Sequence, residues 1–216
     1  MKNEVVIIGR NEGNYVNQII KSLPDDWHKI YVADRCTDNT VDLLQQYNNV
    51  TIVETKNYTG RKTSSCRNLG LSYTDKDSNV LFLDGDRYIE EGDIKTVCEN
   101  AKTDIVLLPL RKEIKRLFSF DILYGSKLNG FYSAGIFFKR NAINKVIDFH
   151  GEFFPTSVEH IWGVEDCYLG DICYHLGLTA SVAYDIVLAG VFERDEISIE
   201  ADTLRMFARS NLKVKS

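Results

Sequence analysis

Two hydrophobic periodicities alternate along the first half of this 216-residue chain, and their alternation limits the possible folds more than any other feature. Short runs of β-branched and other apolar residues are typical of strands that are buried on both faces of a parallel sheet. These runs predict strands at 5–8, 30–33, 50–53, 80–83 and 105–108. Between them, apolar residues at helical spacing predict helices over 16–23, 41–47 and 66–73. The first half is therefore expected to form a doubly wound, Rossmann-like α/β sheet.

The rhythm changes beyond Pro109. We expect a glycine-bracketed strand at 130–138, a short helix from Asn141, an aromatic loop over 153–162 and a helix from Asp166 that ends at Gly177. A last strand over 179–187 and a C-terminal helix over 197–210 complete the prediction. No linker is evident, so we expect one domain over 1–216, divided at about 109 and about 190.

Composition and charge exclude several classes of protein. With 44% hydrophobic and 26% charged residues, the chain is neither disordered nor a disulfide scaffold. A net charge of −5 supplies no global basic field for nucleic acid or an anionic membrane. The five cysteines form no C-x-x-C pair, and no apolar run reaches the ~18 residues of a membrane span or resembles a signal peptide. We therefore expect reduced thiols, no zinc site and a cytoplasmic protein.

Charged residues follow the predicted strands at the edge where an open α/β sheet binds its ligand. Asp84-Gly85-Asp86 comes directly after the strand at 80–83, and two carboxylates that flank a glycine can turn toward one divalent cation. Substrate phosphates usually complete the coordination shell of such a cation. A bare Asp-Gly-Asp is more often only a turn, but its position after a buried strand favours a metal-bound diphosphate.

Five segments in register resemble the family 2 glycosyltransferases of GT-A fold. They are 5–8 with Asn11-Glu12, 32–40, 60–62 with 66–68, 82–86 and 162–166. The resemblance implies a single GT-A domain with a nucleotide-sugar-binding half over about 1–109 and an acceptor-binding and catalytic half over about 110–190. It further implies metal-dependent transfer of a sugar from a nucleotide diphosphate donor, commonly a UDP-sugar, with inversion at the anomeric carbon and Mn²⁺ or Mg²⁺ as the ion.

On the donor side, the resemblance assigns nucleotide-binding roles to four residues. Asp34 is expected to accept a hydrogen bond from the nucleobase, and Glu12 to lie near the nucleoside. Arg67, with Lys62 as a helper, is expected to face the base or the phosphates. Asp34 could instead cap the following helix, and the two basic residues could form surface ion pairs.

The remaining acids are expected to hold the metal and perform the chemistry. Asp84 and Asp86 correspond to the residues that bind the ribose and the metal, with Asp86 the more direct ligand. Asp166 matches the family's general base and Glu165 its neighbour that orients an acceptor hydroxyl, which is consistent with the need to deprotonate a weak nucleophile. Helix capping is the alternative for both, because acids are favoured at a helix N-terminus.

The acceptor is expected between the strand at 130–138 and the loop at 153–162. Trp162, Phe154 and Gly135 are the candidate acceptor contacts, although burial in the core is as good an interpretation of the aromatics. A glycan or lipid-linked glycan is the default acceptor. A modified base in DNA is less favoured, because the net charge of −5 provides no phosphate-binding face.

The chain departs from the family pattern in two respects. Many relatives place a metal-binding histidine after the last core strand, but 184–192 contains none, so a third protein ligand is not identified. The Gln-x-x-Arg-Trp element of processive synthases is also absent, which favours a single-transfer enzyme. A nucleotidyltransferase is an alternative that lacks its usual Gly-rich phosphate loop here, and a non-catalytic nucleotide-sugar-binding module is an alternative that would not need the three aspartates.

Overall fold

A computed structural model describes residues 2–56, 62–109, 135–158 and 164–190. The strands are β1 (Asn3–Gly9), β2 (His28–Asp34), β3 (Val50–Thr55), β4 (Asn79–Asp84), β5 (Arg87–Glu91), β6 (Ile105–Leu107), β7 (Gly135–Phe138), β8 (Ala180–Val182) and β9 (Val187–Gly190). The helices are α1 (Val16–Ser22), α2 (Thr40–Leu44), α3 (Thr63–Ser72), α4 (Ile94–Glu99), α6 (Arg140–His150) and α7 (Val164–His175).

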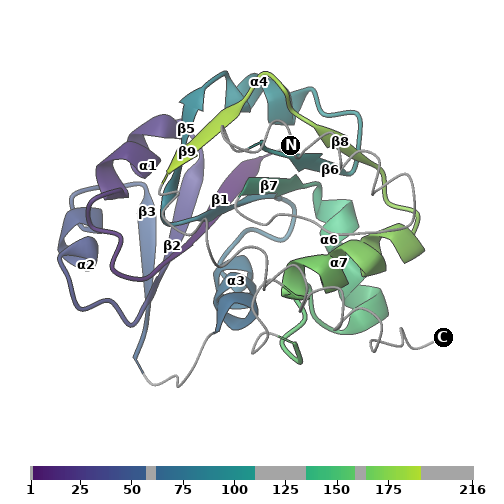
Figure 1. Cartoon of the computed structure of the whole chain (residues 1–216), viewed down its shortest axis with the longest axis horizontal. Coiled ribbons are helices and arrows are strands. Elements are labelled where there is room, and N and C mark those ends of the chain that lie inside the picture. Colours follow the sequence, from purple (N-terminus) through teal and green to yellow (C-terminus); the bar gives the residue numbers. More distant parts are fainter. Residues whose placement is uncertain (1, 57–61, 110–134, 159–163, 191–216) are drawn as a thin grey trace, which may run out of the picture.

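A mixed sheet forms the centre of the molecule (Figure 1). Its strand order is β3-β2-β1-β4-β7-β6-β8. The pairs β3-β2, β2-β1, β1-β4 and β6-β8 are parallel, whereas β7 runs antiparallel to both of its neighbours, β4 and β6. The mostly parallel α/β sheet expected from the sequence is therefore confirmed, with one reversed strand in its interior.

Helices cover both faces of this sheet because successive side chains of each strand point to opposite sides. On one face, Ile7 and Leu83 belong to a core that includes residues of α1, α2 and α4 and of the small β5-β9 sheet. On the other face, Val6 and Phe82 belong to a core that includes residues of α3, α6 and α7 (Figure 1). Burial on both faces explains why the central strands are continuous apolar runs rather than alternating ones.

Two predicted strands differ from the observed ones. The chain expected to form one strand over 179–187 forms β8, a turn and then β9, and β9 leaves the main sheet to pair with β5. The strand expected at 130–138 is described from Gly135 onward, where β7 begins, and 130–134 lies outside the described residues. The predicted C-terminal helix at 197–210 also lies outside them.

The other predicted boundaries agree closely with the structure. The predicted end of the Asp166 helix is confirmed, because Gly177 follows α7 with a positive φ of 64°.

Cys36, Cys66, Cys98 and Cys173 are free thiols. Among the helices that the structure describes, none has the length and apolar character needed to span a bilayer.

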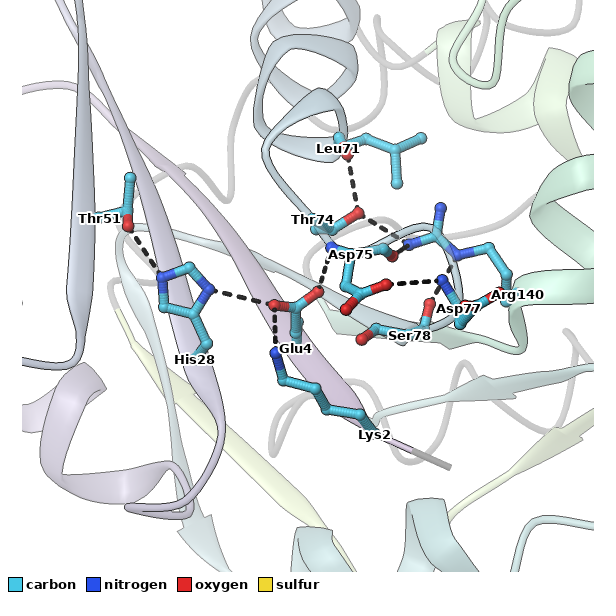
Figure 2. A network of polar contacts seen from close by, with 10 residues as sticks. All are labelled: Lys2, Glu4, His28, Thr51, Leu71, Thr74, Asp75, Asp77, Ser78 and Arg140. Atoms are coloured by element: carbon cyan, nitrogen blue, oxygen red, sulfur yellow. Dashed lines mark hydrogen bonds and ion pairs between the residues drawn. The ribbon is translucent and has the colours of Figure 1, made fainter.

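A polar network ties the amino ends of the strands to the end of α3 (Figure 2). Glu4 of β1 is buried, and its carboxylate accepts hydrogen bonds from the Asp75 amide at 2.6 Å and faces His28 Nδ1 at 3.1 Å. The His28 ring also contacts the Thr51 hydroxyl of β3 at 2.8 Å. Nearby, Arg140 Nε donates to the Ser78 carbonyl at 2.6 Å. These bonds fix the edge of the sheet opposite the carboxyl ends of β1, β2 and β4.

The Glu4 carboxylate is expected to stabilise the fold in a pH-dependent way. Burial would raise its pKa, but the hydrogen bonds from Asp75 and His28 and the charge of Lys2 together hold it below the ordinary value of 4.5. A lowered pKa stabilises the fold above pH 4.5, and this stabilisation disappears as the pH falls through the folded-state value. Glu4→Gln should therefore lower the free energy of unfolding at pH 7 by about 1–3 kcal/mol, and the difference should shrink below pH 4.5.

Urea unfolding between pH 7 and pH 3.5 measures this difference, with the exposed Glu54→Gln as the matched control. A Glu4→Gln effect that stayed constant across the range would show that the carboxylate charge plays no part.

Candidate active site

The carboxyl ends of β1, β2 and β4 meet the beginning of α7 at one edge of the sheet. Gly85 follows β4 and donates its amide to the carbonyl of Ile8 in β1 at 2.7 Å, which joins the two strand ends. The segments that follow β1 and β2 are also joined, because the Asn11 side chain accepts from the Thr37 amide at 2.7 Å and Asp38 accepts from the Gly13 amide at 3.1 Å. All predicted donor-side acids therefore lie along this edge.

Asn11 and Arg35 both adopt left-handed backbone conformations, with φ of 59° and 52°. Such conformations are unfavourable for residues other than glycine and persist where the surroundings enforce them. Each residue follows the end of a strand, so the strained turns lie where the ligand of an open α/β sheet binds. Asp38 Oδ1 accepts from the Thr40 amide at 3.1 Å, a local bond just before α2.

The guanidinium of Arg67 is the centre of the site. It projects from α3, its side chain is 3% exposed, and its Nη2 donates to Asp84 Oδ1 at 2.8 Å. Its Nη1 lies 3.5 Å from Asp166 Oδ1 and 3.6 Å from Glu165 Oε1. The Phe154 ring lies 5.2 Å from the guanidinium carbon, in cation–π range. One buried cation thus connects the predicted donor-side acid with the predicted base.

Arg67 was expected to face a base or phosphates, and the structure places it differently. Its guanidinium lies beneath the carboxylates rather than at the surface, because an arginine can satisfy several acids at once through its fixed fork of donors. Removing a buried charge of this kind would leave three acids near one another without compensation. Arg67 therefore assembles the acids of the site.

Glu165 is buried in this network, with only 7% of its side chain exposed. Desolvation raises the pKa of Glu165 to about 7, the negative charge of Asp166 adds to the rise, and Arg67 opposes it. Its Oε2 atom has no hydrogen-bond partner among the described residues. A carboxyl group in this environment exchanges its proton near neutral pH.

Asp84 and Asp86 present their carboxylates on either side of Gly85. The side chains are 31% and 26% exposed, so both can be reached from solvent. Arg67 engages one oxygen of Asp84, and Arg87 Nη1 lies 3.6 Å from Asp86 Oδ2. Two accessible carboxylates are the hard oxygen ligands that Mg²⁺ and Mn²⁺ prefer, so these residues fit such a cation. No group of three or more His, Cys, Asp or Glu that could hold a metal occurs in the described part of the chain.

Asp34 is held by its neighbour in the sequence. Arg35 Nε and Nη2 donate to the two carboxylate oxygens at 2.9 and 2.6 Å, and Thr55 adds a bond to Oδ1 at 2.8 Å. Burial would raise the pKa of Asp34, but the bonds from Arg35 and Thr55 outweigh it and lower that pKa. Asp34 is thus a fixed, ionised hydrogen-bond acceptor at the end of β2.

The candidate acceptor contacts are not at the surface. Phe154 is fully buried and packs against Phe82 with ring centroids 4.9 Å apart, so its ring belongs to the core and supports Arg67. Gly135 is buried in β7, where a Cβ would meet the Leu188 and Leu108 side chains. The structure therefore agrees with the alternative interpretation of Phe154 as a core residue, and Gly135 is buried as well. Trp162 lies outside the described residues.

The structure also describes the surroundings of two further donor-side candidates, Glu12 and Lys62. Glu12 is half-buried at the active-site edge, and its Cγ is 3.1 Å from the position that a Cβ on Gly9 would occupy. Lys62 immediately precedes α3, and its carbonyl accepts the Cys66 amide at 2.8 Å.

Residues 4–157 match the family model described as "Glycosyl transferase family 2". The chain belongs to glycosyl transferase family 2. This membership confirms the resemblance seen in the sequence and makes the protein a glycosyltransferase. No curated protein matches its sequence.

Solved structures of glucosyl-3-phosphoglycerate synthase from Mycobacterium tuberculosis share the fold of this family 2 member. The complex with Mg²⁺ and UDP has a TM-score of 0.59 and 13% identity, and covers 99% of this chain and 81% of that chain. The complex with Mn²⁺, UDP-glucose and phosphoglyceric acid has a TM-score of 0.56 and 13% identity, with the same coverage. The likeness confirms the GT-A fold class.

Sequence patterns did not reveal two features of this family 2 site. Arg35 was noted beside Asp34 after the second predicted strand, but no role was assigned to it. Tyr31 was assigned only to a strand, yet its hydroxyl reaches the two glycines that follow β1 and β4. The pairing of Arg35 with Asp34 could have been predicted, because the two residues are adjacent in the sequence. The Tyr31 contact could not, because it depends on how three strands pack together.

The raised pKa of Glu165 predicts a variant that is more stable than the parent. An unfolded chain loses the Glu165 proton near pH 4.5, whereas the folded protein keeps it until about pH 7, so the parent loses stability as the pH rises between these values. Glu165→Gln removes this loss. The two proteins should have similar stability near pH 5, and the variant should be more stable by about 1–3 kcal/mol at pH 8.

Unfolding in urea at pH 5 and pH 8 tests this, with the exposed Glu99→Gln as the control. If Glu165→Gln is less stable than the parent at pH 8, the carboxylate is stabilised by Arg67 rather than penalised by burial.

Proposed function

We propose that this family 2 member is a metal-dependent, inverting glycosyltransferase that moves a sugar from a UDP-sugar to an acceptor hydroxyl, with Asp166 as general base. The observation that supports it is the group of three carboxylates, Asp84, Glu165 and Asp166, around the buried Arg67 guanidinium. The Arg67 Nη2 atom lies 2.8 Å from Asp84 at the proposed donor edge. Its Nη1 atom lies 3.5 Å from Asp166 at the start of α7. Displacement at an anomeric carbon requires a general base near the acceptor and a held cation near the departing diphosphate. Asp166 and Asp84, which both face Arg67, would serve these two needs.

The chemical step follows from this arrangement. The acceptor hydroxyl gives its proton to the Asp166 carboxylate while its oxygen forms a bond to the anomeric carbon. The bond between that carbon and the diphosphate oxygen breaks with its electron pair, so UDP leaves on the opposite side and the configuration inverts. Asp166 is in the first turn of α7, where the helix dipole favours its negative charge before it accepts the proton.

Asp84 and Asp86 would hold the divalent cation. When bound, the cation neutralises charge on the departing diphosphate. The solved complexes of glucosyl-3-phosphoglycerate synthase contain UDP with Mg²⁺ or Mn²⁺, which supports the same ions here. With two carboxylates at the turn, diphosphate oxygens and water would supply the rest of the shell.

On the nucleoside side, Asp34 would accept a hydrogen bond from the base, Glu12 would lie beside the nucleoside and Lys62 would assist with the phosphates. Asp34 supports this role because Arg35 and Thr55 fix its orientation. Glu165, beside Asp166, would gain or lose its own proton near neutral pH. Trp162 remains the proposed acceptor contact, since it precedes the base by four residues.

The acceptor class is the least constrained part of the proposal. A solved relative in fold binds phosphoglyceric acid together with UDP-glucose, so a small phosphorylated acid should be assayed beside glycan and lipid-linked glycan acceptors. A modified DNA base is a further candidate for the same chemistry. Family membership favours transfer of a sugar over the nucleotidyltransferase alternative. A non-catalytic binding module would bind the donor and never turn it over.

Replacing the base should separate binding from turnover. Asp166→Asn should bind the UDP-sugar within about threefold of the parent, because Asp166 meets the acceptor rather than the donor, while turnover falls by ~10²–10⁴-fold. Calorimetry measures binding, and release of UDP with and without acceptor measures turnover. The exposed Asp148→Asn on α6 is the matched control and should behave as the parent. Unchanged turnover in Asp166→Asn would reduce this residue to a helix cap.

Removing the cation should abolish tight donor binding. With Mn²⁺ or Mg²⁺ present, calorimetry should show UDP binding that is lost in EDTA and weakened by at least tenfold in Asp86→Asn, since the diphosphate would lose its bridging ion. Asp148→Asn again serves as the control. Equal affinity for UDP in EDTA and in Mn²⁺ would contradict a cation-dependent donor site.

A further inference from the structure

The hydroxyl of Tyr31 is a buried polar group without a hydrogen-bond partner in the described part of the chain. Tyr31 lies in β2, opposite Ile7 of β1, and its side chain is fully buried. Leaving such a hydroxyl unpaired costs about 1–3 kcal/mol, and nearly all buried polar groups in proteins are paired. A phenylalanine would fill the same space without this cost, so the hydroxyl needs an explanation.

Two glycines make room for this hydroxyl at the active-site edge. A Cβ on Gly9 would collide with the Tyr31 hydroxyl. A Cβ on Gly85 would be 2.7 Å from the same hydroxyl and 2.7 Å from the Gly9 Cα. The end of β1, the Asp84-Gly85-Asp86 turn and the phenol are therefore in mutual contact. Tyr31 reaches from the core of β2 to the underside of the proposed cation-binding turn.

The Glu12 side chain borders the same space as the Tyr31 hydroxyl. If Gly9 carried a Cβ, that atom would collide with the Tyr31 hydroxyl and would lie 3.1 Å from Glu12 Cγ. The hydroxyl and the Glu12 side chain therefore border the same small space. Burial raises the pKa of Tyr31, and the negative charges of Glu12, Asp38 and Asp86 contribute to the rise. The phenol therefore remains protonated at any physiological pH and is a hydrogen-bond donor that faces acceptors.

We propose that Tyr31 is a positioning residue whose hydroxyl donates a hydrogen bond to the Glu12 carboxylate when the donor nucleotide and cation are bound. Glu12 Cγ and the Tyr31 hydroxyl border the same Cβ position on Gly9, so in this proposal the Glu12 carboxylate turns toward the hydroxyl when the donor binds. The bond would fix Glu12 against the nucleoside and support the Asp84-Gly85-Asp86 turn from below. This inference rests on the proposed function, since Glu12 is there assigned to the donor.

Tyr31→Phe tests the proposal because it removes one oxygen and keeps the ring. The melting temperature should stay the same or rise, since an unpaired hydroxyl is lost. The dissociation constant for UDP in the presence of Mn²⁺, measured by calorimetry, should increase about tenfold, as expected for a hydrogen bond to a charged group. Tyr47→Phe is the matched control: its hydroxyl donates to Asn17 at 2.6 Å between α2 and α1, and UDP binding should not change.

A double-mutant cycle with Glu12→Gln identifies the partner. If Tyr31 acts through the Glu12 charge, Tyr31→Phe should change UDP affinity by less than twofold in the Glu12→Gln background. Equal losses in both backgrounds, or UDP affinity in Tyr31→Phe within twofold of the parent, would overturn the inference while leaving the proposed function intact. Failure of the parent to bind UDP with Mn²⁺ would remove the proposed function and this inference with it.

Discussion

The buried Arg67 guanidinium is the interaction on which the arrangement of the site depends. Three carboxylates from two separate parts of the chain, Asp84 after β4 and Glu165 and Asp166 at the start of α7, face a single cation within 3.6 Å. Without that charge the three acids would repel one another with no buried cation to compensate them. Because α3 also packs on β1 and β2, the position of Arg67 is set by the first half of the molecule. The packing of α3 in the core therefore also determines where the positive charge of the site lies.

Much of the donor half could be predicted from the sequence because its determinants are local. Continuous apolar runs, buried on both faces, located β1, β2, β3, β4 and β6, and polar residues directly after them located Asp34 and Asp84. A parallel sheet brings such strand ends together whatever the details of packing. The division into halves and the assigned roles of the acids remain predictions, since they concern ligands rather than the fold.

The errors arose where distant contacts decide the outcome. The sequence left Phe154 either as an acceptor contact or as a core residue, and in the structure its neighbours are Phe82, Phe153 and Arg67. The strand expected over 179–187 splits because residues 187–190 find their partner in β5 and not in the main sheet. Arg67 was assigned to a phosphate because its own sequence neighbours do not show the three acids that compete for it. Each of these differences involves a partner far away in the sequence, as with Arg67 and Asp166, 99 residues apart.

The reversed direction of β7 has a consequence for how enzymes of this shape can diversify. Because β7 is antiparallel to β4 and β6, β6 ends and β7 begins at the edge that also carries Asp84, and Leu83 pairs with Gly135. The Leu108 amide donates to the Gly135 carbonyl at 3.0 Å, so the two strand ends are tied to each other. Insertions or deletions between Pro109 and Gly135 would thus leave the register of the sheet unchanged. Evolution, or an engineer, can therefore change the length of the chain between β6 and β7 while Leu83, beside Asp84, keeps its place in the sheet.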